Sequence, residues 1–344
     1  MSVNSLFDHK LRARVIAPAR LHMGFLDLGG SLGRRFGSIG IAVNEIATKL
    51  SLTPSHRLTA HGPGADRAIA AVDKFAAALG RNFETEIHIQ DVIPGHIGLG
   101  SGTQLELAVG MGLSRLYDLD LAVRDIAPIV ERGARSGIGI AVFEQGGLVV
   151  DGGRGENTVI PPVITRLEFP SDWRFILVLD ERDLGLHGKE EIEAFRSLPV
   201  FPAAEAAHLC HLLVMKGLPA LVERDIRGFG EVIAELQRSV GDYFAPAQGG
   251  RFTSTDVANA LAFLEAQGAV GIGQSSWGPT GFCLVEDVSR AETLVSAARQ
   301  HFTGTTGLRF LLASPRNKGA DVVLERAVVE NQRVEASREK AFRL

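Results

Sequence analysis

The 344-residue chain has few cysteines and no long apolar run, and each absence excludes a class of protein. Cys210 and Cys283 lie far apart and in no metal-ligand spacing, which predicts two small core residues in a reducing compartment. No stretch reaches the roughly 18 consecutive apolar residues that would span a bilayer. The first residues contain no apolar signal core. We therefore expect a cytoplasmic protein with no membrane partner.

The chain also lacks an excess of positive charge. Its 36 Lys and Arg residues face 40 Asp and Glu residues, so the formal net charge is -4. A general nucleic-acid binder needs a basic face, so we expect no nucleic-acid partner. A local basic cluster can still bind a small anion. The content of 45% hydrophobic and 22% charged residues is typical of a soluble globular protein, and the length suits two domains.

Hydrophobic periodicity predicts an α+β protein, because strands and helices occur in two blocks rather than in regular alternation. The pair Pro161-Pro162 indicates a joint, which divides the chain into domains at 1–162 and 163–330 and a charged tail at 331–344. In the first block we predict strands over 12–17, 39–42, 46–52 and 85–90, helices over 64–79, 102–116 and 121–135, and short apolar runs at 137–143 and 148–150. In the second we predict strands over 174–179, 281–285, 308–312 and 322–324, and helices over 188–197, 203–216, 218–240, 255–267 and 289–301.

The glycine-rich turn at 94–104 is the strongest chemical signal. Gly98, Gly100 and Gly102 alternate directly before a predicted helix, so backbone N–H groups and the helix dipole face one point. Ser101 and Thr103 add hydroxyls, and Gln104 adds a neutral donor and acceptor. The turn lacks the acidic residue of a dinucleotide fingerprint and the Gly-Lys-Ser/Thr of a Walker loop. It predicts a phosphate site, although a helix cap that binds nothing is the alternative.

Three motifs resemble those of the GHMP kinase superfamily. Pro-x-x-x-Gly-Leu-Gly-Ser at 94–101 resembles its phosphate loop, 17–27 its first motif, and the glycine-rich 271–281 its third. The resemblance implies a two-domain fold, with an N-terminal domain like one in a ribosomal protein and a ferredoxin-like C-terminal domain. It also implies a dimer.

The sequence departs from the kinases where they carry a catalytic aspartate. Gly139 stands at that position in Ser136-Gly137-Ile138-Gly139, and glycine has no side chain to accept a proton or hold a metal. The departures resemble one branch, the β-ribofuranosylaminobenzene 5'-phosphate synthase family of tetrahydromethanopterin biosynthesis. The strings that carry this resemblance lie at 20–25, 98–104, 248–250 and 274–279.

The resemblance implies a phosphoribosyltransferase that joins 5-phosphoribosyl 1-diphosphate to 4-aminobenzoate or 4-hydroxybenzoate and releases carbon dioxide and diphosphate. An ATP-dependent small-molecule kinase is the alternative, and a non-catalytic ligand sensor is a third possibility. Diphosphate departure calls for Mg²⁺ and backbone donors. We place the diphosphate at Gly98, Gly100, Ser101, Gly102, Thr103 and Gln104, with Thr103 as a candidate metal ligand.

The remaining candidate residues each have a structural alternative. Arg20 and His22 are candidate catalytic residues, against a surface ion pair and a partly buried histidine. Asp27 either acts in catalysis as a magnesium ligand or caps the turn before Gly29-Gly30. The candidate substrate-binding residues are Lys189, Gln248, Ser275, Ser276 and Trp277, where Trp277 either stacks on the arene or fills the core. The basic turn at 314–319 is interpreted as structural or as the rim of the site.

Overall fold

The computed structural model describes residues 11–182 and 197–326. The predicted helix over 188–197, apart from its last residue, the candidate Lys189 and the predicted tail at 331–344 lie outside the described residues. Of the two cysteines, Cys283 is buried as predicted, whereas Cys210 is exposed, so the core interpretation is wrong for Cys210. Within the described ranges, no helix is both long and apolar enough to cross a bilayer.

A seven-stranded sheet is built on two long antiparallel strands, β1 (Leu11–Asp27) and β2 (Phe36–Pro54). The strand order is β11-β1-β2-β4-β3, and β5 pairs with both β2 and β6. The other strands are β3 (Thr59–His61), β4 (Thr85–Asp91), β5 (Leu148–Asp151), β6 (Val163–Leu167) and β11 (Asp321–Arg326). The strands predicted over 39–42 and 46–52 are one strand, β2, which continues through Glu45 although this residue has a positive φ.

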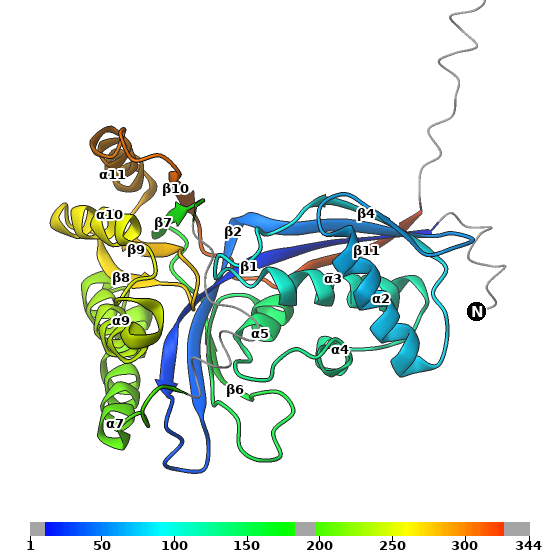
Figure 1. Cartoon of the computed structure of the whole chain (residues 1–344), viewed down its shortest axis with the longest axis horizontal. Helices are drawn as coiled ribbons and strands as arrows, with labels where there is room; N and C mark the ends of the chain where they lie inside the picture. The colour runs from blue at the N-terminus through cyan, green and yellow to red at the C-terminus, as the bar shows by residue number, and fades with distance from the viewer. Residues whose placement is uncertain (1–10, 183–196, 327–344) are drawn as a thin grey trace, which may run out of the picture.

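Helices pack on one face of this sheet (Figure 1). They are α2 (Ala65–Leu79), α3 (Ser101–Leu116), α4 (Val123–Ile129) and α5 (Ile138–Gln145). The helix predicted over 121–135 is wrong at its C-terminal end, because α4 stops at Ile129 and residues 130–137 form a loop. The apolar run at 137–143 is helical, and its residues from Ile138 to Phe143 are buried in α5.

The second sheet has four strands in the order β10-β7-β9-β8. They are β7 (Arg174–Asp180), β8 (Val270–Gln274), β9 (Gly281–Val285) and β10 (Leu308–Ala313). Alternate residues of β7 belong to different core clusters: Ile176 and Val178 cluster with residues of α10 (Thr255–Ala266) and α11 (Val288–His301), whereas Phe175 and Leu177 belong to the cluster that includes residues of α9 (Ile226–Gln248). Helix α7 (Ala203–Leu212), a π-helical turn at Leu213–Gly217 and α8 (Leu218–Val222) precede α9.

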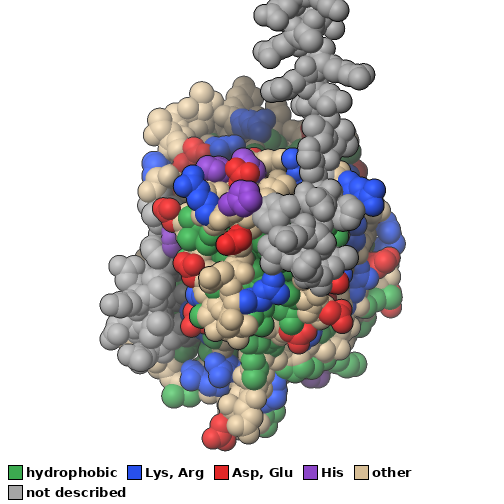
Figure 2. Space-filling model, turned by 90° about the vertical axis from the view of Figure 1, so that its right-hand side faces the viewer, with side chains coloured by type: hydrophobic (Ala, Val, Ile, Leu, Met, Phe, Trp, Pro, Cys, Tyr) green, Lys and Arg blue, Asp and Glu red, His purple; other side chains and the backbone are tan. Residues whose placement is uncertain are grey.

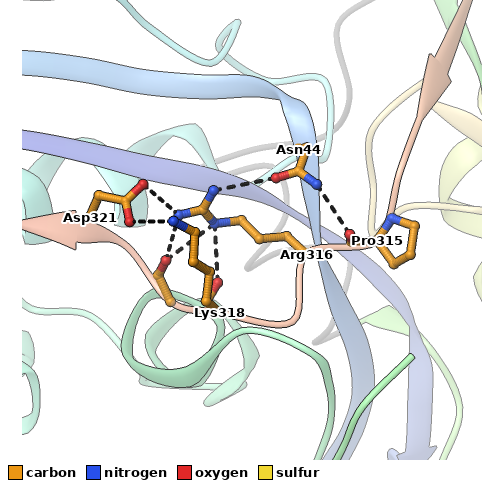
Figure 3. Close-up of polar contacts among 6 residues, drawn as sticks. Asn44, Pro315, Arg316, Lys318 and Asp321 are labelled. Carbon is orange, nitrogen blue, oxygen red and sulfur yellow. Dashed lines mark hydrogen bonds and ion pairs between the residues drawn. The ribbon is translucent and has the colours of Figure 1, made fainter. Parts of the chain in front are cut away.

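Two strands beyond residue 162 return to the first sheet. β6 pairs with β5, and β11 pairs with β1. The turn between β10 and β11 is fixed by Arg316, which donates to the carbonyl oxygens of Lys318 and Gly319 and to the side chains of Asn44 and Asp321 (Figure 3). The domain boundary predicted at 162/163 stays a prediction. The first sheet itself contains two strands, β6 and β11, from beyond that boundary.

The largest core cluster joins the two sheets. Leu21, Met23 and Phe25 of β1 lie in it together with Phe244 of α9 and Trp277, which follows β8. The middle of β1 therefore lies at the junction between the halves, where the glycine-rich turn and the third motif also meet. On the surface at the right-hand end of the molecule in Figure 1, basic and acidic side chains are interspersed, as Figure 2 shows.

Candidate active site

The glycine-rich turn and the third motif contact each other backbone to backbone. Gly98 has φ +82°, and a Cβ atom there would overlap the carbonyl oxygen of Ser275. A Cβ atom on Gly278 would in turn overlap the backbone of Ile97 and Gly98. Both positions therefore require glycine, which brings the start of α3 against a segment some 180 residues away (Ser275 and Gly98 are 177 apart).

Ser275 joins three segments through its buried hydroxyl. Its Oγ accepts from the backbone N–H of His22 at 3.0 Å and donates to the Gly98 carbonyl at 2.7 Å. The guanidinium of Arg20 donates to the same carbonyl at 2.5 Å. The predicted residues Arg20 and Ser275 thus fix the shape of the glycine turn, and the Ser275 hydroxyl is occupied by this role.

A cavity of about 510 Å³ opens at the N-terminus of α3. The N-cap, Gly100, has φ +80° and no side chain, so the first N–H groups of this 16-residue helix have no side-chain cap. Gly98, Gly100, Ser101, Gly102 and Thr103 all line the cavity. The combination of free helical N–H groups and the positive dipole end favours an anionic ligand here.

Four arginines line the same cavity: Arg20, Arg67, Arg132 and Arg135. A Cβ atom on Gly102 would lie 3.1 Å from a terminal nitrogen of Arg67 and 3.0 Å from one of Arg132, so both guanidinium groups border the first turn of α3. Arg132 is also held by a bidentate ion pair with Glu106, with bonds of 2.6 and 2.7 Å. Guanidinium groups in this arrangement match the oxygens of phosphate groups.

Glu131 is the one carboxylate among the described residues that line this cavity. Lys74 lies 2.8 Å from it, and the hydrogen bond and charge of this lysine lower the pKa of Glu131. The net charge of the lining is therefore strongly positive, which suits a ligand with several negative charges.

Aromatic residues also line the cavity. Phe25 and Trp277 line it, and Trp277 packs on Phe244 with ring centroids 4.1 Å apart. His22 lies beside Phe25, with ring centroids 4.5 Å apart. Burial, and next the positive charge of Arg20, hold the pKa of His22 well below its usual range, so its imidazole is neutral at pH 7. The lining of the cavity thus combines cationic groups with apolar rings.

The structure brings most of the predicted residues together. Those that line the main cavity are Arg20, His22, Gly98, Gly100, Ser101, Gly102, Thr103, Ser276 and Trp277. Gln104 points elsewhere, because its amide donates to the carbonyl of Gly139 at 2.8 Å. Gln248 lines a smaller adjoining cavity, which shares His22, Phe25 and Ser276 with the main one.

Asp27 lies outside both of these cavities. Its Oδ1 accepts from the N–H groups of Gly29 and Gly30 at 2.8 and 2.7 Å. Asp27 therefore caps the turn before these glycines, which was one of its two predicted roles. The described residues contain no group of three His, Cys, Asp or Glu side chains suited to a metal ion. This donor set does not fit a magnesium ion held mainly by protein, since the cavity offers chiefly the hydroxyls of Ser101 and Thr103.

Thr103 faces the position at which the kinase resemblance expects an aspartate. A Cβ atom on Gly139 would lie 3.1 Å from the Thr103 methyl carbon. The Thr103 side chain thus occupies space that a longer side chain at 139 would enter. The two positions are complementary, and neither supplies a carboxylate.

Arg67, Arg132 and Arg135 were missed in the sequence. Arg132 and Arg135 fall in a segment predicted as the end of a helix, where they look like solvent-facing residues. The available signal was the run Glu131-Arg132-Gly133-Ala134-Arg135-Ser136, in which a glycine interrupts the helix directly before the segment that replaces the kinase aspartate motif. Arg67 on α2 carries no local signal, because only the packing of α2 beside α3 brings it to the cavity.

Comparison with known proteins identifies the class. The GHMP kinase N-terminal domain matches residues 66–147, and the GHMP kinase C-terminal domain matches residues 218–304. The fold is similar to that of Lactococcus lactis galactokinase complexed with galactose, with a TM-score of 0.66, 15% identity and coverage of 90% of this chain and 95% of that one. The predicted α+β fold of the GHMP kinase class is therefore confirmed.

Full-length relatives narrow the class to one family. The chain is 34% identical to β-ribofuranosylphenol 5'-phosphate synthase of Archaeoglobus fulgidus, over 90% of this chain and 99% of the relative. It is 30% identical to the enzyme of that name from Methanothermobacter thermautotrophicus, over 89% and 97%. The chain belongs to this family of synthases and is an enzyme of the GHMP class.

Proposed function

We propose that this enzyme joins 5-phosphoribosyl 1-diphosphate to 4-hydroxybenzoate or 4-aminobenzoate, with loss of diphosphate and carbon dioxide. The observation that carries the proposal is the lining of the cavity, in which four arginines and the start of α3 occur together with Phe25 and Trp277. A phosphorylated sugar suits the cationic residues and an arene suits the aromatic ones. The relatives are named for a ribofuranosylphenol phosphate, which combines the same two parts.

The cationic residues would hold the diphosphate and stabilise it as it leaves. Negative charge develops on the bridging oxygen as the ribose C1–O bond breaks, and fixed N–H groups and guanidinium groups stabilise this charge without reorganising. The N–H groups of the first turn of α3, with Arg67 and Arg132, face this position. No side chain is required as a covalent catalyst.

The aromatic residues would hold the ring against the ribose carbon. Trp277 and Phe25 present apolar surface, and Ser276, which has φ +58° and also lines the cavity, is held in a strained conformation. Holding the two reactants in contact converts a bimolecular encounter into an oriented step. The ring carbon that bears the carboxylate forms the new bond, and carbon dioxide then leaves.

A kinase reaction receives less support from the same residues. Phosphate transfer by these kinases would use a carboxylate at position 139, and Gly139 faces only Thr103. Glu131, the carboxylate that lines the cavity in the described chain, is bound to Lys74. Asp151 does not replace it, because this carboxylate accepts from the N–H groups of Gly137 and Gly153 and does not line the cavity.

Further parts of the proposal extend the family resemblance. Mg²⁺ would arrive with the diphosphate as part of the substrate, since the cavity residues do not form a magnesium cage. We also propose a homodimer in the cytoplasm and a role in tetrahydromethanopterin biosynthesis. Lys189 and Gln248 remain proposed substrate-binding residues.

The test is incubation of the purified protein with 5-phosphoribosyl 1-diphosphate, Mg²⁺ and carboxyl-labelled 4-hydroxybenzoate or 4-aminobenzoate. We expect labelled carbon dioxide and diphosphate to form in equal amounts. Parallel reactions with ATP in place of the sugar diphosphate provide the control. Absence of carbon dioxide release with both acids would overturn the proposal, and ADP formation would favour the kinase.

A further inference from the structure

His22 has one ring nitrogen without a protein partner. It lies in the middle of β1, is 2% exposed, and lines both the main cavity and the smaller adjoining one. Its Nε2 makes no hydrogen bond to any residue that the structure describes. A buried polar atom without a partner is costly, so a ligand that reached this nitrogen from the adjoining cavities would supply a missing bond.

The chemical state of the ring follows from its surroundings. Burial and the positive charge of Arg20 lower the pKa of His22, so the ring is a neutral imidazole. A neutral imidazole has one nitrogen that carries hydrogen and one that has a lone pair, and a base at Nε2 requires the tautomer in which Nδ1 carries the hydrogen.

His22 lies beside an aromatic residue of the site. The ring of Phe25 packs against it, and Ser276 lines the same two cavities. The backbone N–H of His22 is fixed by Ser275, which also holds the Gly98 carbonyl of the phosphate loop. His22 is therefore held at a set place relative to both the proposed diphosphate and the proposed arene.

We propose that Nε2 of His22 is the general base that accepts the para-hydroxyl proton of 4-hydroxybenzoate and later returns it. This inference rests on the proposed function, and it assigns the site to a phenolic acid rather than to an aniline. A phenol that loses its proton as its ring attacks becomes a much stronger carbon nucleophile.

The step balances without any other reactant. The ring carbon that bears the carboxylate bonds to ribose C1, the C1–O bond breaks, and its electron pair leaves with diphosphate. The O–H proton moves to Nε2, and the O–H bonding pair becomes part of the C=O of a dienone. The bond to the carboxylate then breaks, carbon dioxide leaves, and its electron pair restores the aromatic ring. The oxygen takes the proton back from Nε2, so His22 ends neutral.

The charged groups around His22 support this role. The two cavities present arginines and few acids, and they contain Arg20, Arg67, His96, Glu131, Arg132, Arg135 and Arg251. Surrounding positive charge disfavours the imidazolium form in the resting enzyme, so the base is unprotonated when substrate binds. Once the negative diphosphate and carboxylate occupy the cavities, their charge stabilises the protonated form of the imidazole.

The test compares wild type with His22→Gln, whose amide can form hydrogen bonds but cannot act as a base. With 4-hydroxybenzoate we expect kcat to fall about 10²–10⁴-fold, the usual contribution of a general base. The KM for 5-phosphoribosyl 1-diphosphate should stay within about threefold, because the substitution leaves the arginines and the α3 N–H groups assigned to the diphosphate unchanged. The exposed His88, on β4 and 3.2 Å from Glu86, provides the matched control His88→Gln, which should behave as wild type.

A substrate series distinguishes a base from a structural residue. The hydroxyl of 3,5-difluoro-4-hydroxybenzoate ionises near neutral pH and needs little help, so the ratio of wild-type to variant kcat should fall at least tenfold with it. 4-Aminobenzoate, which can form an iminium without losing a proton, should show the same small ratio if it is a substrate. Equal losses with all three acids, or no loss with 4-hydroxybenzoate, would overturn the role of His22.

A second measurement needs no variant, in case His22→Gln fails to fold. The pH profile of wild-type kcat/KM with 4-hydroxybenzoate should have an acid limb below pH 6.5, and this limb should be absent or weaker with the difluoro acid. The same acid limb with both substrates would contradict the inference. If wild type releases no carbon dioxide with any acid, the proposed function fails, and the inference fails with it.

Discussion

Two basic turns of this chain have different roles. The cavity turn, residues 131–136, presents Arg132 and Arg135 to the cavity beside α3. The return turn, residues 314–319, directs Arg316 inward, where carbonyl oxygens, Asn44 and Asp321 occupy its donors (Figure 3). An arginine whose N–H groups are all bonded to its own chain stabilises the fold. An arginine that borders a cavity can bind a ligand.

The supporting residues explain the difference. Arg132 is fixed by one carboxylate, Glu106, and its side chain is 35% exposed, whereas the side chain of Arg316 is 11% exposed. Arg132 is thus oriented without being enclosed. Substitutions in the two turns should separate stability from binding.

The largest effect is expected for Arg316→Ala. It removes a network that joins β2, the return turn and β11, and it takes the guanidinium donor from the partly buried carbonyl of Gly319. We expect the free energy of unfolding to fall by about 2–4 kcal/mol, measured by denaturant titration. The Kd for 5-phosphoribosyl 1-diphosphate should be unchanged in the folded fraction. If Arg316→Ala bound the sugar diphosphate more weakly and unfolded with unaltered free energy, Arg316 would be a binding residue and the assigned role of the return turn would be wrong.

Sequence reasoning reached the fold class because periodicity and the glycine motifs are local signals. It identified about half of the described residues that line the cavity, since Gly98, Gly100–Thr103, Ser276 and Trp277 belong to these motifs. It could not find Arg67, because α2 places this residue through packing alone. Nor could it decide between the two alternatives for Asp27, which depended on whether Gly29 and Gly30 turned their N–H groups toward its side chain.

Arg132→Gln should have the second largest effect, and on binding rather than folding. Loss of one charged donor should weaken 5-phosphoribosyl 1-diphosphate binding by about 1.5–3 kcal/mol, roughly 10–100-fold in Kd by calorimetry. The single variant leaves Glu106 without its partner, so stability also falls somewhat. In the double variant with Glu106→Gln, stability should recover and the binding defect should remain. Recovery of both would show that Arg132 only neutralises Glu106.

Arg67→Gln should weaken the same binding by about 5–10-fold, because Arg67 borders the first turn of α3 without a bidentate carboxylate to orient it. The slope of Kd against salt concentration should also decrease, since one cation is lost. Arg124→Gln is the matched control, because Arg124 pairs with Glu144 and lies outside the cavity. Equal effects of the two substitutions would indicate a general charge effect rather than a site.

Lys318→Gln in the return turn should have the smallest effect. Lys318, and after it Arg316, lower the pKa of Asp321. A lowered folded-state pKa stabilises the protein above the unfolded value near 4, and this stability is lost as the pH falls through the folded-state pKa. The variant should therefore lose less stability than wild type between pH 5 and pH 2, by under about 1 kcal/mol because the pair is exposed. A steeper acid loss than in wild type would contradict the assigned pair.

The central claim is that the arginine-lined cavity at α3 binds a phosphoribosyl diphosphate. Calorimetric titration of wild type and Arg132→Gln with 5-phosphoribosyl 1-diphosphate and with ATP, each with Mg²⁺, tests it most directly. We predict that wild type binds the sugar diphosphate at least tenfold more tightly than ATP, and that Arg132→Gln loses most of this affinity. Tighter binding of ATP, or unchanged binding of the sugar diphosphate by Arg132→Gln, would contradict the claim.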